Sequence, residues 1–280
     1  MRIGVISDLH NDKFEHRFFN NEDNDDVFTS DYSLMHHKDI LKDIDVLAIA
    51  GDISFDGRSN FQKWIDFYQD QLFLITKRHV PIIAPFGNHD YYEQSEFFLN
   101  QLLGTKEETP KKPYMHQKIL IVDDCVFFSC TLWSPILNDE CYKYIQDYRY
   151  IPFLSPRFGG YKKNIDKLYK RDKEWLLSNV EKQYKIFGDS KKYICVTHHA
   201  PIKELIPNKY KNDPINSAFT NLIDDDNKAY LDLPISLWIY GHIHDKNDIV
   251  VKNTRFVANP RGHSHELETY SNFKPIIVEV

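Results

Sequence analysis

Short apolar runs rich in Ile and Val recur along the chain and are bounded by Gly, Pro, Asn or Asp. Continuous apolar runs of this length are typical of strands buried on both faces of a sheet. The runs are Ile3 to Ile6, Val46 to Ala50, Ile82 to Pro85, Ile119 to Val122, Val126 to Phe128, Tyr193 to Val196 and Leu237 to Tyr240. Between several of them, apolar residues recur every three or four positions, as in 61–72 and 165–180, which predicts helices with one apolar face. This alternation predicts an α/β protein.

The chain has 280 residues, of which 42% are hydrophobic and 27% charged. Such a composition is that of an ordinary globular protein long enough to bury a sizeable core. Because no repeat, low-complexity tract or linker is visible, we expect one domain over residues 1–280. The polar segment 11–38 lacks periodicity and is acidic near its middle. We interpret it as a surface insertion that forms a flap, and 134–161, rich in Tyr and Pro, as an ordered aromatic loop.

The formal net charge is −6. A nucleic-acid partner is therefore possible but not favoured, since such binders usually carry a net basic domain or stripe. The four cysteines show no Cys-x-x-Cys pairing and are expected to be reduced core residues. The first residues show no charged leader, and no apolar run approaches the length of a membrane span. We therefore expect a cytoplasmic protein with no membrane partner.

Residue types that bind metals follow five of the predicted strands directly. They are Asp8 and His10, Asp52, Asn88 and His89, His198 and His199, and His242 and His244. In open α/β sheets, sites gather at the carboxyl ends of strands. We therefore expect these five groups to converge on one crevice.

Each group taken alone has an ordinary structural explanation. Asp8 at a strand end could cap a helix, and Gly51-Asp52 is a common turn sequence. Gly241-His242-Ile243-His244 is more specific, because two His residues two positions apart on an extended segment point the same way. A metal site is favoured because separate accidents at five strand ends would all have to coincide.

The donor types indicate the kind of metal. Oxygen and imidazole ligands without thiolate suit divalent ions such as Mn, Fe, Ni or Zn. The candidate ligands are Asp8, His10, Asp52, Asn88, His198, His242 and His244. Seven residues exceed what one tetrahedral ion needs. If one carboxylate bridges, the set divides between two ions roughly 3.5–4 Å apart, as in two-metal phosphoryl transfer.

In their order along the chain, these motifs resemble those of the calcineurin-like metallophosphoesterase superfamily. The motifs are Asp8-x-His10, Gly51-Asp52, Gly87-Asn88-His89-Asp90, Thr197-His198-His199-Ala200-Pro201 and Gly241-His242-Ile243-His244. The segments 130–134, 171–176 and 259–262 are also similar to bacterial-type members of the superfamily. The resemblance implies a four-layer α/β/β/α sandwich, in which two mixed sheets face each other and are flanked by helices.

The resemblance also implies a role for each ligand. Asp8, His10 and His244 would hold one ion. Asn88, His198 and His242 would hold the other, with Asp52 bridging the two. The cofactors would be two divalent ions, Mn, Fe, Zn or Ni, with manganese favoured. A water or hydroxide between the ions would attack phosphorus.

Four further residues are implied around the ligands. His89 would stabilise the developing charge or protonate the leaving oxygen, and Asp90 would orient His89. His199 is expected to pack behind the ligands or to contact one of them. Arg261 would bind phosphate through its guanidinium or hold a nearby loop, although it could also simply pair with a surface carboxylate.

The function expected is hydrolysis of a phosphate monoester or diester, with a small phosphorylated substrate. The alternatives are a nuclease of the same superfamily and a binding scaffold that has lost turnover. The sequence does not fix the oligomeric state. The aromatic residues Tyr91, Tyr92, Trp133, Tyr148 and Tyr150 could stack on a ring of the substrate, but ordinary packing is favoured for each.

Overall fold

The computed structural model describes residues 1–11, 33–54, 57–93, 117–155, 161–266 and 270–280. A four-stranded sheet has the order β10-β1-β2-β3. Its strands are β1 (Arg2–Ile6), β2 (Val46–Ile49), β3 (Ile82–Ile83) and β10 (Ile276–Glu279). β1, β2 and β3 are parallel, whereas β10 pairs antiparallel with β1. The sheet is therefore mixed, as expected.

A six-stranded sheet has the order β4-β5-β6-β7-β9-β8. Its strands are β4 (Lys118–Val122), β5 (Cys125–Cys130), β6 (Lys192–Thr197), β7 (Ile235–Tyr240), β8 (Asn247–Val251) and β9 (Thr254–Ala258). The four central strands β5, β6, β7 and β9 are parallel, and the edge strands β4 and β8 are antiparallel to their neighbours. This sheet is also mixed.

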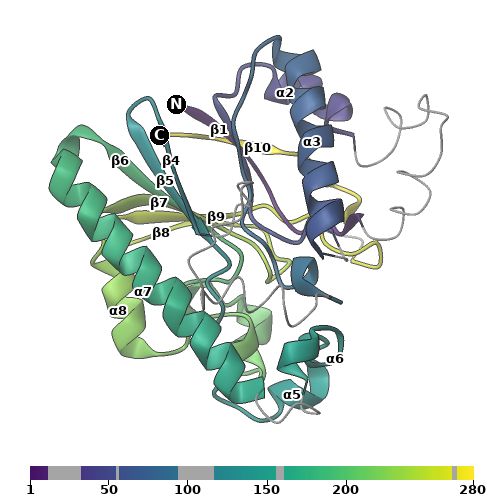
Figure 1. Ribbon diagram of the computed structural model, residues 1–280, viewed down its shortest axis with the longest axis vertical. Coiled ribbons are helices and arrows are strands. Elements are labelled where there is room, and N and C mark those ends of the chain that lie inside the picture. The colour runs from purple at the N-terminus through teal and green to yellow at the C-terminus, as the bar shows by residue number, and fades with distance from the viewer. Residues whose placement is uncertain (12–32, 55–56, 94–116, 156–160, 267–269) are drawn as a thin grey trace.

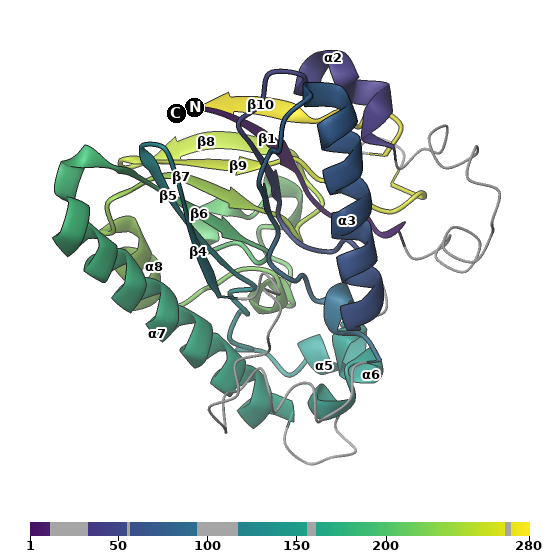
Figure 2. The same ribbon diagram turned by 45° about the horizontal axis from the view of Figure 1, so that its top comes forward.

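Helices cover the outer faces of both sheets. Helix α3 (Gly57–Thr76) lies on the side of the four-stranded sheet, and α7 (Tyr161–Phe187) lies on the opposite side of the molecule with α8 (Asp224–Leu231) (Figures 1 and 2). The described residues also form the shorter α-helices α2 (Lys38–Leu41), α5 (Cys141–Tyr144) and α6 (Asp147–Tyr150). In the same ranges, the 3-10 turns are Leu34–His37, His89–Tyr91, Pro152–Leu154, Gly188–Ser190, Lys203–Leu205, Asn208–Tyr210 and Asn216–Ala218. The predicted four-layer sandwich is confirmed.

Alternate residues of each central strand pack on opposite faces of its sheet. On β5, Phe127 is buried between the two sheets, where it packs in one cluster with Val5 of β1. Its neighbours Val126 and Phe128 instead join a cluster with Leu176 of α7. Because both faces are covered, the strands need apolar residues at every position, which explains the continuous runs in the sequence.

The seven strands predicted from apolar runs are present, but β8, β9 and β10 were not predicted. β8 is an edge strand in which every second residue is exposed, so it lacks a continuous apolar run. Most of the expected insertion, 12–32, lies outside the described residues. In its last part, Leu34 is buried and its N–H donates to Gln71 Oε1 at 2.6 Å, and the surface insertion stays a prediction. The single-domain assignment stays a prediction.

Among the helices in the described ranges, none combines the length and the apolar character that crossing a membrane requires.

Candidate metal centre

The predicted ligands lie where parallel strands of both sheets end. They follow β1, β2 and β3 in one sheet and β6 and β7 in the other. The two sheets are joined at this edge by a parallel bridge between Ser7 and Pro260. The Ser7 N–H donates to the carbonyl of Asn259 at 3.1 Å, and the Arg261 N–H donates to the carbonyl of Ser7 at 2.9 Å. Loops from two sheets therefore meet at one site.

Two groups of possible metal ligands share one residue, Asp52. The first group is Asp8, His10, Asp52 and His244, and the second is Asp52, His198 and His242. Within each group the ligand atoms lie within 4.8 Å of one another. Asn88 belongs beside the second group, because its Oδ1 is 2.8 Å from His198 Nε2. This is the division expected from the sequence, whereas coordination of metal by each residue stays a prediction.

Hydrogen bonds behind the second group fix which atoms face the site. His198 Nδ1 lies 2.8 Å from the carbonyl of Ala50, so its Nε2 is the nitrogen presented to a metal. Asn88 Nδ2 donates to Asp147 Oδ1 at 2.7 Å, which leaves the amide oxygen as the ligand. Such outer partners orient ligands and set their tautomers.

The first group is oriented in the same way. His244 Nδ1 is 2.7 Å from Glu266 Oε2, and its Nε2 is 3.0 Å from His10 Nε2. Asp8 Oδ1 accepts a hydrogen bond from the His242 N–H at 2.8 Å. Asp8 Oδ2 is buried and has no hydrogen-bond partner among the described residues. A buried carboxylate oxygen without a donor is costly unless a cation binds it, so the residues fit a metal ion.

Carboxylates and imidazoles of the site shift one another's pKa values. Burial alone would raise the pKa of Asp52, but the nearby His198 and His89 hold it well below its usual value. Burial would lower the pKa of His198, but the Asp52 carboxylate raises it to about 9. Likewise, Asp8 and Glu266 outweigh burial and raise the pKa of His244 to about 10. These carboxylates thus favour positive charge at the positions where the cations would bind.

Five of the seven predicted ligands have a left-handed backbone. The φ angles are 52° at Asp8, 44° at His10, 54° at Asp52, 69° at His242 and 53° at His244. They account for five of the eleven non-glycine residues with positive φ in the described part of the chain. Asp and His tolerate this region better than most residues, yet each such residue costs free energy. The concentration of strain at one place indicates a functional site.

Two glycines allow the ligand loops to approach one another. A Cβ on Gly87 would lie 2.0 Å from Asp52 Oδ1, and a Cβ on Gly51 would lie 2.4 Å from His198 Nδ1. Gly51 also has a φ of 83°. Any side chain at these positions would displace a predicted ligand.

His89 lies beside the cluster and faces a cavity. Its ring stacks on Tyr92 with a centroid distance of 4.4 Å. It forms a T-shaped pair with the ring of His10, with centroids 4.5 Å apart. Its N–H donates to Asp52 Oδ1 at 2.9 Å. His89 is thus tied to the residue that both groups share and remains open to a substrate.

Asp90 does not have the role that the sequence suggested. Its Oδ2 accepts from the N–H groups of Gly87 at 2.8 Å and Asp52 at 3.0 Å, and its Oδ1 accepts from the N–H of Ser54 at 2.8 Å. The expectation that this carboxylate orients His89 is therefore replaced by another function. Asp90 joins the loop after β2 to the loop after β3, and so positions Asp52.

His199 and Arg261, the other two residues expected around the ligands, contact neighbouring parts of the protein. The centroid of the buried His199 ring lies 5.1 Å from that of Trp133 and 4.2 Å from that of His242, and its role beside the ligands stays a prediction. The Arg261 guanidinium donates to the carbonyl of Leu9 and, at 3.4 Å, to Asn11 Oδ1. It therefore holds a loop, and it is buried rather than placed on the surface, whereas the phosphate contact considered for it stays a prediction.

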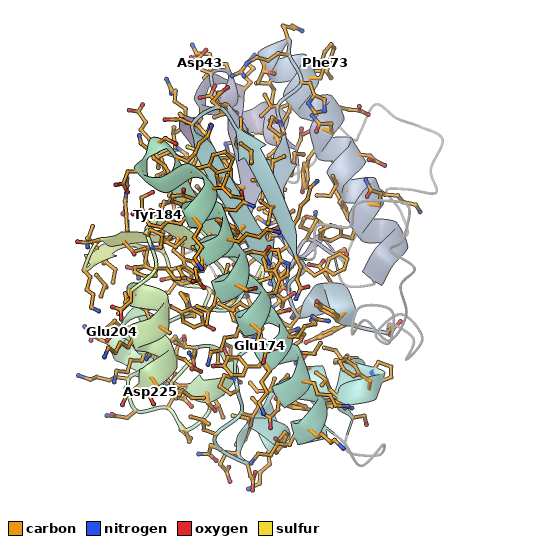
Figure 3. All side chains as sticks on the ribbon, turned by 60° about the vertical axis from the view of Figure 1, so that its left-hand side comes forward. Asp43, Phe73, Glu174, Tyr184, Glu204 and Asp225 are labelled. Carbon is orange, nitrogen blue, oxygen red and sulfur yellow. The ribbon has the colours of Figure 1, made fainter. Side chains whose placement is uncertain are left out.

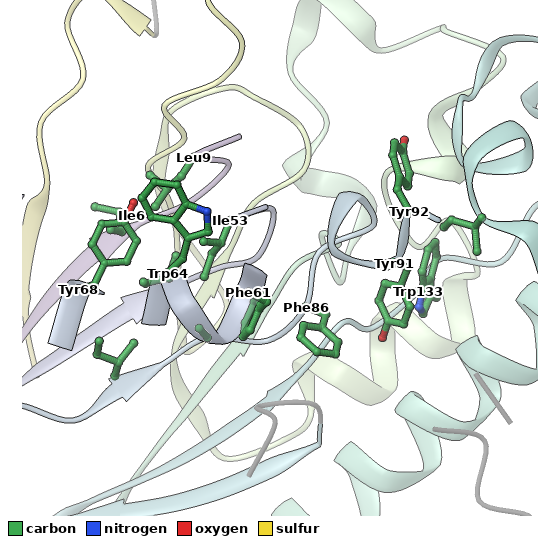
Figure 4. Packing of buried hydrophobic residues seen from close by; sticks show 14 of the residues in the cluster. Ile6, Leu9, Ile53, Phe61, Trp64, Tyr68, Phe86, Tyr91, Tyr92 and Trp133 are labelled. Carbon is green, nitrogen blue, oxygen red and sulfur yellow. The ribbon is translucent and has the colours of Figure 1, made fainter. Parts of the chain in front are cut away.

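Three residues of the site were missed by the sequence analysis. Asp147 and Glu266 hold Asn88 and His244 as described above. The ring of His263 stacks on His10 with centroids 4.0 Å apart. Of the five aromatic residues considered for ring stacking, Tyr92 lines the cavity, whereas Tyr91 and Trp133 pack against each other in the core (Figure 4). The segment 263–266 follows β9, a strand that was not predicted, so the rule that ligands follow predicted strands did not point to it.

A cavity of about 600 Å³ opens directly on the cluster. Its inner side is formed by Asp52, Asn88, His89, His242 and His244. This volume falls within the range of ordinary small-molecule sites.

A family model described as calcineurin-like phosphoesterase matches residues 1–246. The chain belongs to the calcineurin-like phosphoesterase family. It is therefore a metallophosphoesterase hydrolase, and the buried His and Asp groups fit the dimetal centre that the family uses.

This calcineurin-like phosphoesterase is similar to several known proteins. It is 29% identical over 265 residues to uncharacterized protein L509 of Acanthamoeba polyphaga mimivirus, covering 88% of this chain and 89% of that protein. The solved phosphopantetheinyl hydrolase PptH of Mycobacterium tuberculosis matches with a TM-score of 0.57 and 15% identity, over 99% of this chain and 95% of that one. A putative 5'-nucleotidase from Staphylococcus aureus matches with a TM-score of 0.50 and 13% identity, over 93% and 49%. At these identities the two structures show the fold alone.

Proposed function

We propose that this calcineurin-like phosphoesterase hydrolyses a phosphate monoester or diester of a small molecule with two divalent ions. The observation that carries the proposal is that Asp52 belongs to both ligand groups, so that one carboxylate can bridge two ions. Manganese is favoured, with Fe, Zn and Ni as the other candidates. The bound ions would supply Lewis acidity to the phosphoryl oxygens and lower the pKa of water.

The residues beside the ligands would complete the chemistry. His89 faces the cavity and is held through its N–H by Asp52, so its imidazole can donate a proton to the leaving oxygen. His263 lines the same cavity and stacks on His10. Phe219 stacks on His242 with ring centroids 4.8 Å apart and would shield that imidazole from water. The chain's own contribution is thus orientation and proton transfer.

The two alternatives have less support. A scaffold without turnover would not need His89 open to the cavity beside a full set of seven ligand residues. A nuclease would need cations along a groove, but no Lys or Arg is among the described residues that line the cavity.

We further propose that the protein acts in a reducing compartment such as the cytoplasm. Cys125, Cys130, Cys141 and Cys195 are all buried and free of disulfides. Buried thiols of this kind are typical of proteins kept in reducing surroundings.

The test is hydrolysis by metal-stripped protein after addition of Mn, Fe, Ni, Zn, Co or Mg. A chromogenic phosphate monoester is compared with the corresponding diester. We expect turnover to require added metal. The ratio of the two rates identifies the preferred ester. The variant Asp52→Asn should lower kcat by at least a hundredfold, because the shared ligand loses its charge. The variant His89→Ala should lower kcat by about 10²- to 10⁴-fold.

Two exposed residues provide matched controls. Asp225 lies on the surface of α8 (Figure 3), and His79 is exposed in the turn after α3. Asp225→Asn and His79→Ala should keep the parent kcat. Hydrolysis that survives removal of metal, or that is unaffected by Asp52→Asn, would contradict the proposal.

A further inference from the structure

The outer wall of the cavity is built from apolar and aromatic side chains. The wall comes from 144–147 at the junction of α5 and α6 and from 206–220, which includes two 3-10 turns. Its apolar members are Tyr144, Ile145, Ile206, Pro207, Tyr210, Ile215 and Phe219. We define these seven residues as the apolar wall. It faces the His and Asp cluster across the same cavity.

Two aromatic side chains of the apolar wall are open to solvent. Tyr144 is 67% exposed and Tyr210 is 43% exposed. Other large aromatic residues near the site, such as Tyr91 and Trp133, are buried. Exposed aromatic groups that line a site are well suited to a ligand that covers them.

The charge of the cavity selects against polyanions. Among its described lining residues there is no Lys or Arg, but the carboxylates of Asp147, Asp213 and Glu266 are present in addition to Asp52. Lys209 is not part of the lining: its Nζ forms an ion pair with Asp245 at 2.7 Å and also lies 5.0 Å from the ring centroid of Tyr210. A second phosphate or a nucleic-acid backbone would therefore find no Lys or Arg among the described lining residues and would lie near the carboxylates of Asp147 and Asp213.

We propose that the substrate carries a single phosphoryl group, placed at the ligand cluster, and an uncharged apolar or aromatic alcohol portion that lies on the apolar wall. This inference rests on the proposed function and specifies its substrate class. A nucleoside diphosphate, a nucleic acid or another polyanion would be a poor substrate. Tyr210 and Ile215 would act as specificity-determining residues for the alcohol portion.

The experiment uses 4-alkylphenyl phosphates with alkyl chains from methyl to hexyl, as monoesters or as methyl diesters, whichever class the protein hydrolyses. A para alkyl group of any length leaves the pKa of the departing phenol nearly constant, so differences in kcat/KM report contacts with the wall. We expect kcat/KM to rise by about twofold to fourfold for each added CH₂ that is buried. Nucleoside diphosphates should be hydrolysed at least tenfold more slowly than the hexyl compound.

Variants of the wall test the assignment. Tyr210→Ala and Ile215→Ala should reduce the ratio of kcat/KM between the hexyl and methyl compounds by about threefold or more. Tyr184, an exposed tyrosine on the outer side of α7 (Figure 3), provides the matched control. Tyr184→Ala should preserve the ratio. Circular dichroism confirms that each variant folds.

A second readout separates the inference from the proposed function. The corresponding 4-alkylphenylphosphonic acids have a P–C bond in place of the ester and cannot be hydrolysed, and their Kd for the metal-loaded protein is measured by calorimetry. If no ester is turned over although two ions bind, the proposed function fails, and a Kd that falls with chain length still supports the wall. Values of kcat/KM and Kd that do not depend on chain length, or a preference for nucleoside diphosphates, would overturn the inference.

Discussion

The guanidinium of Arg261 donates a hydrogen bond to the carbonyl of Leu9. Leu9 lies between Asp8 and His10, two residues whose backbones are left-handed. The guanidinium also lies 5.4 Å from the ring centroid of Tyr270. A residue near the end of the sequence therefore stabilises the first ligand turn, beneath which Trp64 and Tyr68 pack with Leu9 (Figure 4).

We therefore expect Arg261→Ala to act on metal binding more than on substrate recognition. Loss of a charged donor to a buried carbonyl should destabilise the protein by about 2 kcal/mol. Affinity for the ions should fall, with little change in KM at saturating metal. Thermal unfolding and metal titration measure the two effects. A large rise in KM at saturating metal would instead support the phosphate-binding role.

A second prediction concerns Glu266. Because its carboxylate is 2.7 Å from His244 Nδ1, Glu266→Ala should release that ring and weaken metal binding by about 10- to 100-fold. Competition with a chelator measures the affinity. Glu204→Ala, at an exposed glutamate, is the control and should bind metal like the parent (Figure 3). Equal affinity in both variants would show that Glu266 does not orient the ligand.

Metal uptake should release protons. The pKa values of His198, about 9, and His244, about 10, lie above neutral pH, so both side chains are in the cationic imidazolium form in the metal-free protein. A metal needs neutral imidazole, so about two protons per protein should be released at pH 7, and affinity should increase as pH rises from 7 to 9. Calorimetry in buffers of different ionisation enthalpy counts these protons. Uptake without proton release would contradict the assignment.

The same pKa values predict how the metal-free protein responds to pH. Both pKa values are raised above the ordinary histidine value of about 6.5. Their stabilising contribution is therefore full below about pH 6.5 and is lost as pH rises through the folded-state values of about 9 and about 10. Urea unfolding of metal-free protein should show decreasing stability from pH 6.5 to 9. Bound metal should remove this decrease, because the imidazoles are then neutral throughout.

Gly87→Ala provides a test of the close approach of the ligand loops. The added Cβ would lie 2.0 Å from Asp52 Oδ1, so we expect loss of metal-dependent activity or of folding. Gly188→Ala is the matched control, since its Cβ would meet nothing within 4 Å and only its φ of 53° would be strained. The control should lose about 1 kcal/mol of stability and keep its activity. Similar outcomes for the two variants would show that packing at Gly87 is unimportant.

Features that depend on neighbours in the sequence could be predicted from the sequence alone. Strands such as β6 appear in the sequence as continuous apolar runs because both of their faces are covered. His198 is recognised as a candidate ligand because it directly follows such a run. Asp147 and Glu266 gave no comparable signal. Their importance depends on Asn88 and His244, which they meet only after folding. The wrong role for Asp90 has the same origin, since adjacency to His89 in sequence did not reveal the backbone N–H groups that surround its carboxylate.

The bridge between Ser7 and Pro260 has a consequence for the order of folding. During synthesis, a chain folds from its N-terminus as it leaves the ribosome. The turn that carries Asp8 and His10 must nevertheless wait for Asn259 and Arg261, which follow some 250 residues later. Contacts so distant in sequence slow folding, and the nascent protein passes through most of its elongation without a complete site. If the ions bind only the complete site, they would bind this protein late in its biogenesis.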